Sequence, residues 1–397
     1  MPGLRGALKW FVSVGFALAW LLLPARAEAY PWMIRHGYSS CVGCHEDPSG
    51  AGILTSYGRV IESALLPTGA SAEGEEEAAP GFLFGLLKTP DWLNLEGDLR
   101  ALWLRSKVPG AKLTDKLIFM QADAAAAIAV SSFRAVGTLG YADEGALGAP
   151  LTRGVEHNLV SRQHWLGYGF ADRSLLLRAG RMNLPFGIRT VEHTLWAKSL
   201  TRTTINDDQQ YGVALALSTE KLRGELMGIV GNFQLRPDDY RERGYSAFAE
   251  YLPDPGLALG VSSLITHRQL DTATLKETWR HTHGAFGRWA TGWQPLVLQT
   301  EWDYVFVSSR DEYHRKGLVS FLQADLEPVE GIHFLATAEA NKVGSLKRFW
   351  GYGAWLSYWW FFTPHADVRL DAIYQSLESL EGRYGSYSLL LQGHLSL

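Results

Sequence analysis

The chain has 397 residues, a formal net charge of -4 at pH 7, and a composition that is 47% hydrophobic and 12% aromatic. The acidic balance and the lack of a Lys/Arg cluster argue against nucleic acid as a partner. After residue 30 no apolar run is long enough for a transmembrane helix. Abundant glycine and aromatic residues without such runs are typical of strands that alternate between lipid and water.

Residues 1–29 have the pattern of a secretory signal peptide. Arg5 and Lys9 precede an apolar run from Trp10 to Leu23, and small residues follow it up to Ala29. This run is short for a membrane anchor, so a cleaved signal is the better interpretation. We therefore expect an exported protein.

Directly behind this signal, residues 41–45 form one C-x-x-C-H motif that uses the only two cysteines of the chain. The motif is typical of c-type haem attachment, in which Cys41 and Cys44 form thioethers and His45 becomes an axial iron ligand. A zinc site would need a second ligand pair nearby, and a redox dithiol would leave His45 unexplained. We predict that residues 30–66 form a segment with one covalent haem c.

An acidic stretch follows, and we interpret residues 67–90 as a flexible linker.

From residue 91 to 397, apolar and polar residues alternate along the sequence. Between Leu93 and Trp103, apolar residues occupy every second position and polar residues such as Asp98 lie between them. The last fifteen residues repeat the pattern and resemble the terminal recognition strand of bacterial outer-membrane barrels, although this chain ends in Leu397 where those usually end in Phe. The predicted fold class is all-β, a transmembrane outer-membrane β-barrel.

About sixteen alternating segments can be counted in residues 91–397. The connections between them are alternately short and long, as in outer-membrane barrels with short periplasmic turns and longer external loops. A soluble β-sandwich would need about half as many strands. An even strand count places both ends of the barrel, and hence the haem segment, on the periplasmic side.

Residues 178–187 resemble the strand-to-loop Gly-Arg...Pro-Phe-Gly segment of bacterial porins of the phosphate-selective kind. This resemblance implies that the long loop 183–208 folds into the barrel and narrows it. The alternative is a loop that stays outside.

The haem segment as a whole resembles the outer-membrane monohaem cytochrome and porin fusions. The matching residues are Arg35, Gly37, Cys41, Cys44, His45, Pro48, Leu54 and Tyr57-Gly58-Arg59. Members of this family oxidise extracellular ferrous iron, so the resemblance implies an electron-transfer role with iron as donor. The residues after Arg59 depart from the family's pattern, which puts the iron substrate in more doubt than the electron transfer.

The opposite face of the iron needs a second ligand if the haem is to relay electrons, whereas an open face would support small-molecule or peroxide chemistry. His36 is our first candidate for this distal ligand, although it lies only five residues before Cys41. Met33 and an open site are alternatives. Three barrel histidines at lumen-facing parity are further candidates, namely His333, His365 and His394.

We therefore expect an outer-membrane electron-transfer protein whose haem segment plugs or caps the barrel. Its partners would be outer-membrane lipid, a periplasmic electron carrier such as a soluble cytochrome, and an extracellular redox substrate. One haem is short compared with the roughly 25 Å apolar band of such barrels, so it must sit inside the lumen. The alternatives are a diffusion porin whose haem-bearing plug gates or senses, and a barrel-tethered, peroxidase-like haem enzyme.

Overall fold

A computed structural model describes most of the chain. The described residues are 31–68, 82–84, 86–142, 159–170, 174–192, 194–205, 208–231, 242–271, 275–293, 295–310, 314–344, 350–379 and 382–397. The predicted signal peptide, 1–29, and most of the predicted linker lie outside them. Three helical elements are described: the 3-10 helix η2 (Pro31–His36) and the α-helices α2 (Ser56–Leu65) and α3 (Trp196–Thr201). None of these is long and apolar enough to span a membrane.

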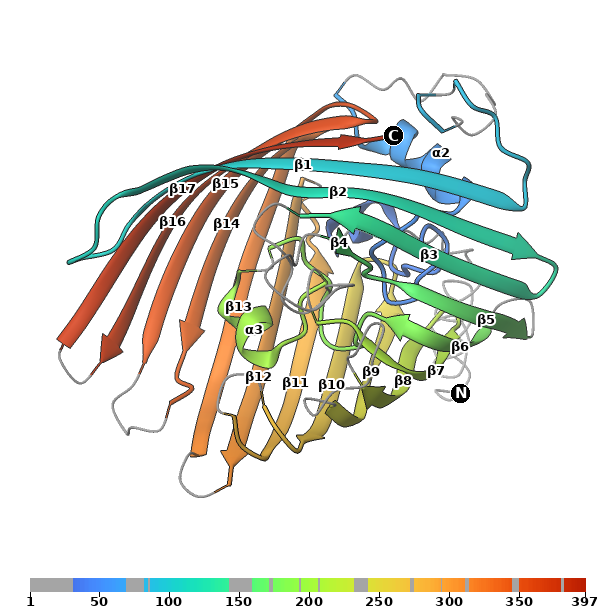
Figure 1. Cartoon of the computed structure of the whole chain (residues 1–397). Coiled ribbons are helices and arrows are strands. Elements are labelled where there is room, and N and C mark those ends of the chain that lie inside the picture. Colours follow the sequence, from blue (N-terminus) through green and yellow to red (C-terminus); the bar gives the residue numbers. More distant parts are fainter. Residues whose placement is uncertain are drawn as a thin grey trace, which may run out of the picture.

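The strands form one antiparallel sheet that closes on itself (Figure 1). The strands are β1 (Leu93–Lys107), β2 (Thr114–Val130), β3 (Phe133–Tyr141), β4 (Leu159–Val160), β5 (His164–Phe170), β6 (Leu175–Met182), β7 (Gln210–Ser218), β8 (Leu222–Gly231), β9 (Glu242–Asp254), β10 (Leu257–Arg268), β11 (Thr278–Ala290), β12 (Leu296–Ser309), β13 (His314–Val329), β14 (Ile332–Asn341), β15 (Gly351–Thr363), β16 (Ala366–Ser379) and β17 (Gly382–Ser396).

Pairing of the first and last long strands closes the barrel. β1 pairs with β17 from Asp98 opposite Ser396 to Lys107 opposite Tyr387. β4 has only two residues and pairs with the same strand, β3, as β5 does, so the two together act as one interrupted strand. The barrel therefore has sixteen strands, which confirms the predicted fold class and strand count.

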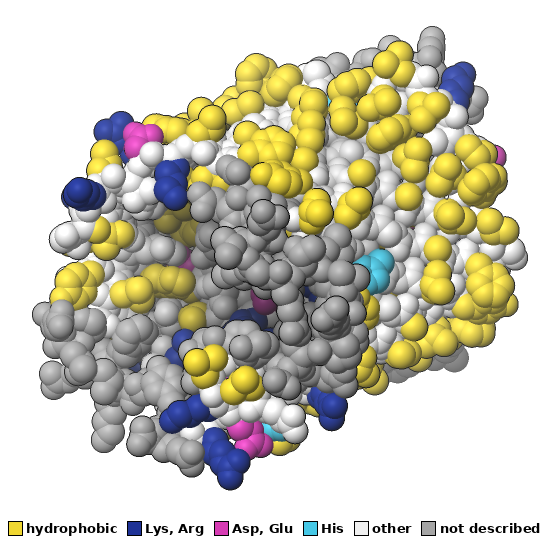
Figure 2. Space-filling model, in the orientation of Figure 1, with side chains coloured by type: hydrophobic (Ala, Val, Ile, Leu, Met, Phe, Trp, Pro, Cys, Tyr) yellow, Lys and Arg dark blue, Asp and Glu magenta, His cyan; other side chains and the backbone are white. Residues whose placement is uncertain are grey.

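Side chains alternate between the two faces of the wall. Leu166, Leu226 and Leu356 are more than half exposed on the outside. Charged side chains occupy the inner positions; Glu301, Asp303, Arg178 and Arg181 are fully buried there. Figure 2 shows the outer wall covered by hydrophobic and uncharged side chains, with Lys, Arg, Asp and Glu gathered mainly at the rims. This is the distribution that a strand crossing lipid around a polar lumen requires.

The two ends of the barrel differ in their connections. One end carries tight turns, such as those between β2 and β3 and between β15 and β16, whereas the other carries the long loops. We call them the short-turn end and the long-loop end. β1 begins and β17 finishes at the short-turn end, as the even strand count predicted.

Two segments fold into the lumen from opposite ends. Residues 31–68, which we call the plug, contact the short-turn end: Thr68 N donates to Phe361 O at 2.9 Å, and Arg35 Nε lies 3.1 Å from Glu327 Oε2. The loop between β6 and β7 enters from the long-loop end and carries α3. Its Lys198 Nζ donates to Glu301 Oε1 at 2.6 Å on the inner face of β12. Of the two courses that the sequence left open for this loop, the structure shows the inward one.

Apolar packing holds both segments against the wall on more than one side of the lumen. Trp32, Met33 and Ile34 of the plug pack against inward side chains of the wall, among them Leu335 and Trp359. A second cluster joins the loop to the wall through Leu195, Trp196, Phe248, Phe286, Val305, Phe321 and Trp355. A third joins Ile53 of the plug and Leu184 and Phe186 of the loop to Ala127, Val136 and Trp165. Beside β1 to β3 and β17 the lumen keeps a cavity.

Candidate functional site

The C-x-x-C-H residues form a compact turn between η2 and α2. His45 N donates to Cys41 O at 3.0 Å, which closes one helical turn, and Thr55 Oγ1 donates to Gly43 O at 2.7 Å. Gly58 of α2 packs directly on this turn, because a Cβ at that position would lie 2.3 Å from Cys44 O. Only glycine allows α2 to approach so closely, and the motif is thereby fixed in place.

The imidazole of His45 is oriented by its own segment. Its Nδ1 lies 3.0 Å from Gly52 O, so Nδ1 carries the proton and Nε2 keeps its lone pair. Burial lowers the pKa of His45, which favours the neutral ring. A metal-binding histidine is typically held in this way, with one nitrogen hydrogen-bonded to a carbonyl and the other available for the metal.

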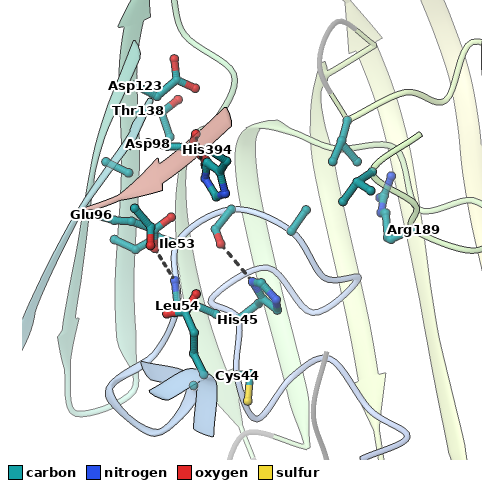
Figure 3. A pocket seen from close by; sticks show the side chains of 18 of the residues that line it. Cys44, His45, Ile53, Leu54, Glu96, Asp98, Asp123, Thr138, Arg189 and His394 are labelled. Carbon is teal, nitrogen blue, oxygen red and sulfur yellow. Dashed lines mark hydrogen bonds and ion pairs between the residues drawn. The ribbon is translucent and has the colours of Figure 1, made fainter. Parts of the chain in front are cut away.

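His45 and Cys44 line a large cavity between the plug and the wall (Figure 3). This cavity has a volume of about 220 Å³ and opens to solvent. The facing wall is polar and charged; its lining side chains include Glu96, Asp98, Arg100, Asp123, Arg162 and His394.

Cys41 faces a second, adjoining cavity. Its Sγ accepts a hydrogen bond from Arg223 Nη1 at 2.6 Å. Pro31 and Arg189 line both cavities, so the side chain of Arg189 stands where the two spaces meet. Neither cysteine forms a disulfide. Two thiols, a histidine with an available nitrogen and nearby guanidinium groups fit the needs of a covalent haem with two carboxylates.

Some candidates for the distal ligand line this cavity, and others do not. His394 and His365 line it, as does Met33. Nδ1 of His394 lies 2.7 Å from Asp367 Oδ2, and its buried Nε2 lies 3.3 Å from Asp98 Oδ1, within ion-pair distance. Figure 3 shows the imidazoles of His394 and His45 in the same space.

The other two histidines lie elsewhere. His36 Nε2 accepts from Arg35 Nε at 3.0 Å and lies 3.7 Å from Glu327 Oε2 at the short-turn end. His333 packs against Trp32, with ring centroids 4.2 Å apart and the ring planes tilted by 45°. Neither lines the cavity of His45. His36 as distal ligand stays a prediction, but the arrangement of side chains favours His394.

The two acidic residues after the motif anchor the plug, a role that our sequence reasoning missed. Arg134 Nη1 donates to Glu46 Oε2 at 2.7 Å, and Arg178 Nη1 lies 3.2 Å from Asp47 Oδ1. Burial alone would raise the pKa of Asp47, but the charges of Arg178 and Arg189 outweigh it and lower that pKa. The sequence did contain a signal for this role: two carboxylates directly follow C-x-x-C-H, and the predicted strands carry arginines at lumen-facing positions that could pair with them.

Further polar contacts tie the plug to strands all around the lumen. Arg288 Nη2 donates to Ser39 O at 3.0 Å, and Leu54 N donates to Glu96 Oε2 at 2.9 Å. Arg59 of the plug lines the cavity and donates to Leu95 O. The plug is therefore held by buried charge as well as by apolar packing.

The fold was compared with known proteins. No sequence family matches the chain, and no curated protein matches it by sequence. Solved structures do match. OmpT, an outer-membrane protein of Vibrio cholerae, aligns with a TM-score of 0.58 and 11% identity over 77% of this chain and 97% of its own.

Two further porins give the same result. An anion-selective porin from Comamonas acidovorans aligns with a TM-score of 0.58 and 8% identity, over 77% of this chain and 99% of its own. OprB of Pseudomonas putida has a TM-score of 0.55 and 11% identity, over 77% and 94%. At such identities the likeness concerns the fold alone. The chain has the fold of an outer-membrane porin barrel, with a plug in its lumen.

Proposed function

We propose that this barrel carries one c-type haem in its lumen and transfers electrons between an extracellular redox substrate and a periplasmic carrier such as a soluble cytochrome. The observation that carries the proposal is the orientation of His45, whose Nε2 is left available beside the cavity between the plug and the wall. The family resemblance of the plug suggests ferrous iron as the donor, which would make the protein an iron oxidase.

In this proposal each side chain has a defined task. Cys41 and Cys44 would hold the macrocycle through thioethers, and His45 would bind its iron. We assign a second iron-binding role to His394, which lines the same cavity and whose Nε2 would exchange Asp98 for the metal while Asp367 holds its Nδ1. A haem held by these residues would supply one-electron redox chemistry.

The second candidate function is a diffusion channel whose haem-bearing plug gates or senses. The likeness to porins supports this function more directly than it supports electron transfer. Gating requires the plug to leave the lumen, however. The buried pairs of Glu46 with Arg134 and of Asp47 with Arg178 oppose that movement.

Liposomes containing the full-length protein would separate the two functions. A redox dye and a small fluorescent solute are trapped inside, and ferrous iron or dithionite is added outside. We expect reduction of the dye without loss of the solute, and no reduction with the Cys44→Ser variant. Loss of the solute without dye reduction would instead identify a channel.

The spectrum of the purified haem protein tests the axial ligands. We expect a low-spin spectrum that becomes high-spin in His394→Ala and stays low-spin in His365→Ala and His36→Ala. A change in His36→Ala alone would make His36 the distal ligand. A high-spin, five-coordinate spectrum of the unaltered protein would favour the peroxidase-like alternative.

A further inference from the structure

A separate cavity lies at the long-loop end, on the other side of α3 from the plug. Its volume is about 210 Å³. Its charged side chains come from the first turn after α3 and from the long-loop ends of β9, β10, β11 and β13. These are Arg202, Glu242, Arg268, Asp271, Arg280 and Arg315.

The lining has more positive than negative charge. Glu242 accepts from Arg280 Nη2 at 2.6 Å and also from Arg268. Asp271 Oδ2 lies 3.0 Å from Arg202 Nη1 and 3.4 Å from Arg268 Nη1. Two carboxylates thus serve three guanidinium groups, and Arg315 adds a fourth, so the described lining residues carry a formal charge of +2. Asp208, outside this lining but near Arg268 and Arg280, reduces the sum to +1.

Arg315 differs from the other three arginines. Its Nε is buried and has no hydrogen-bond partner, and among the described residues its guanidinium has no ion pair. The Nε of Arg268 is also buried without a partner. Burying such donors is costly unless an acceptor satisfies them. The cavity therefore has unused donors and excess positive charge in the same place.

We infer that this cavity binds a small oxyanion of the carboxylate or phosphate class, which reaches it from the long-loop end. Guanidinium groups recognise both anions through paired N–H donors. Arg315 contributes the unused donors, and Arg202 and Arg268 contribute positive charge around them. This site does not depend on the haem, and it lies outside the plug cavity.

Calorimetric titration of the full-length protein in detergent, at low salt, tests this inference. Inorganic phosphate and citrate are titrated separately, which shows which of the two anions the site takes. We expect binding that weakens at least tenfold in Arg315→Gln and less in Arg315→Lys, since lysine keeps the charge but loses the planar fork.

Arg310→Gln is the matched control, because the side chain of Arg310 is 72% exposed nearby and lies 3.5 Å from Glu277. Its affinity should equal that of the unaltered protein. Circular dichroism and thermal melting establish that each variant is folded. The inference is overturned if neither anion binds, or if a folded Arg315→Gln protein binds both as tightly as before.

Discussion

The plug and the α3 loop both fill the lumen, but they are held there differently. The plug is attached through buried ion pairs and hydrogen bonds to strands on several sides of the barrel, including β1, β3, β6, β11 and β13. The loop enters from the other end and is held by ion pairs of Lys198 with Glu301 on β12, of Glu192 with Arg369 on β16 and of Arg202 with Asp271 after β10. Because the two segments are anchored at different points of the wall, we expect removal of an anchor of one segment to loosen that segment and leave the other in place.

The largest effect is expected from Asp47→Ala. This change leaves Arg178 buried with only Glu225 beside it, and removal of one partner from a buried pair typically costs about 3 to 5 kcal/mol. The docking of the plug should weaken by that amount while the barrel stays folded. Hydrogen exchange of the plug amides measures it, with Asp91→Ala, on an exposed residue, as the control. Unchanged protection would show that apolar packing alone holds the plug.

A smaller effect is expected from Lys198→Ala. Glu301 loses its two contacts with Nζ, at 2.6 and 2.7 Å, but still accepts from Ile188 N at 2.7 Å. The loss should be near the lower end of the range for buried pairs, about 3 kcal/mol, and confined to the loop. Faster exchange of the α3 amides with an unchanged plug is the expected result. The exposed Lys221→Ala is the control, and a simultaneous release of the plug would mean that the two segments form one unit.

The smallest effect concerns Glu62 of α2. Burial, reinforced by the nearby charge of Glu96, raises the pKa of Glu62 to about 8. Because this lies above the unfolded value of about 4.3, protonation stabilises the docked plug, and that stabilisation is lost as the pH rises toward 8. Protection of α2, corrected for intrinsic exchange, should therefore fall as the pH rises from about 5 to about 8 and then level off, and less so in Glu62→Gln. An identical pH profile in both proteins would contradict this, and the exposed Glu220→Gln serves as control.

Much of the wall could be predicted from the sequence, because strand periodicity is a local property. Alternation of apolar and polar residues marked sixteen segments, and the contrast of tight turns with long loops gave the orientation of the barrel ends. The inward course of the loop after Met182 was one of two alternatives that the sequence left open. The C-x-x-C-H motif supplied the candidate ligands directly.

The pairing across the lumen could not be predicted. Asp47 meets Arg178, and His45 shares a cavity with His394, only because the closed barrel brings distant strands to the plug. Neither of these two pairings produces a periodic pattern in the sequence that could have predicted it. His36 is near the motif in sequence but is held at the short-turn end by Arg35 and Glu327. Proximity along the chain was therefore a poor guide to the distal side of the site.

The closure between β1 and β17 has a consequence for assembly. The plug contacts strands from β1 through β15, and the cavity beside it is completed by β17, so its docking site does not exist before the first and last strands pair. Contacts that span nearly the whole chain form late, because the entropy of closing so long a loop must be offset first. The N-terminal segment, made first, is thus seated last, and until then its cysteines remain accessible to chemistry outside the barrel.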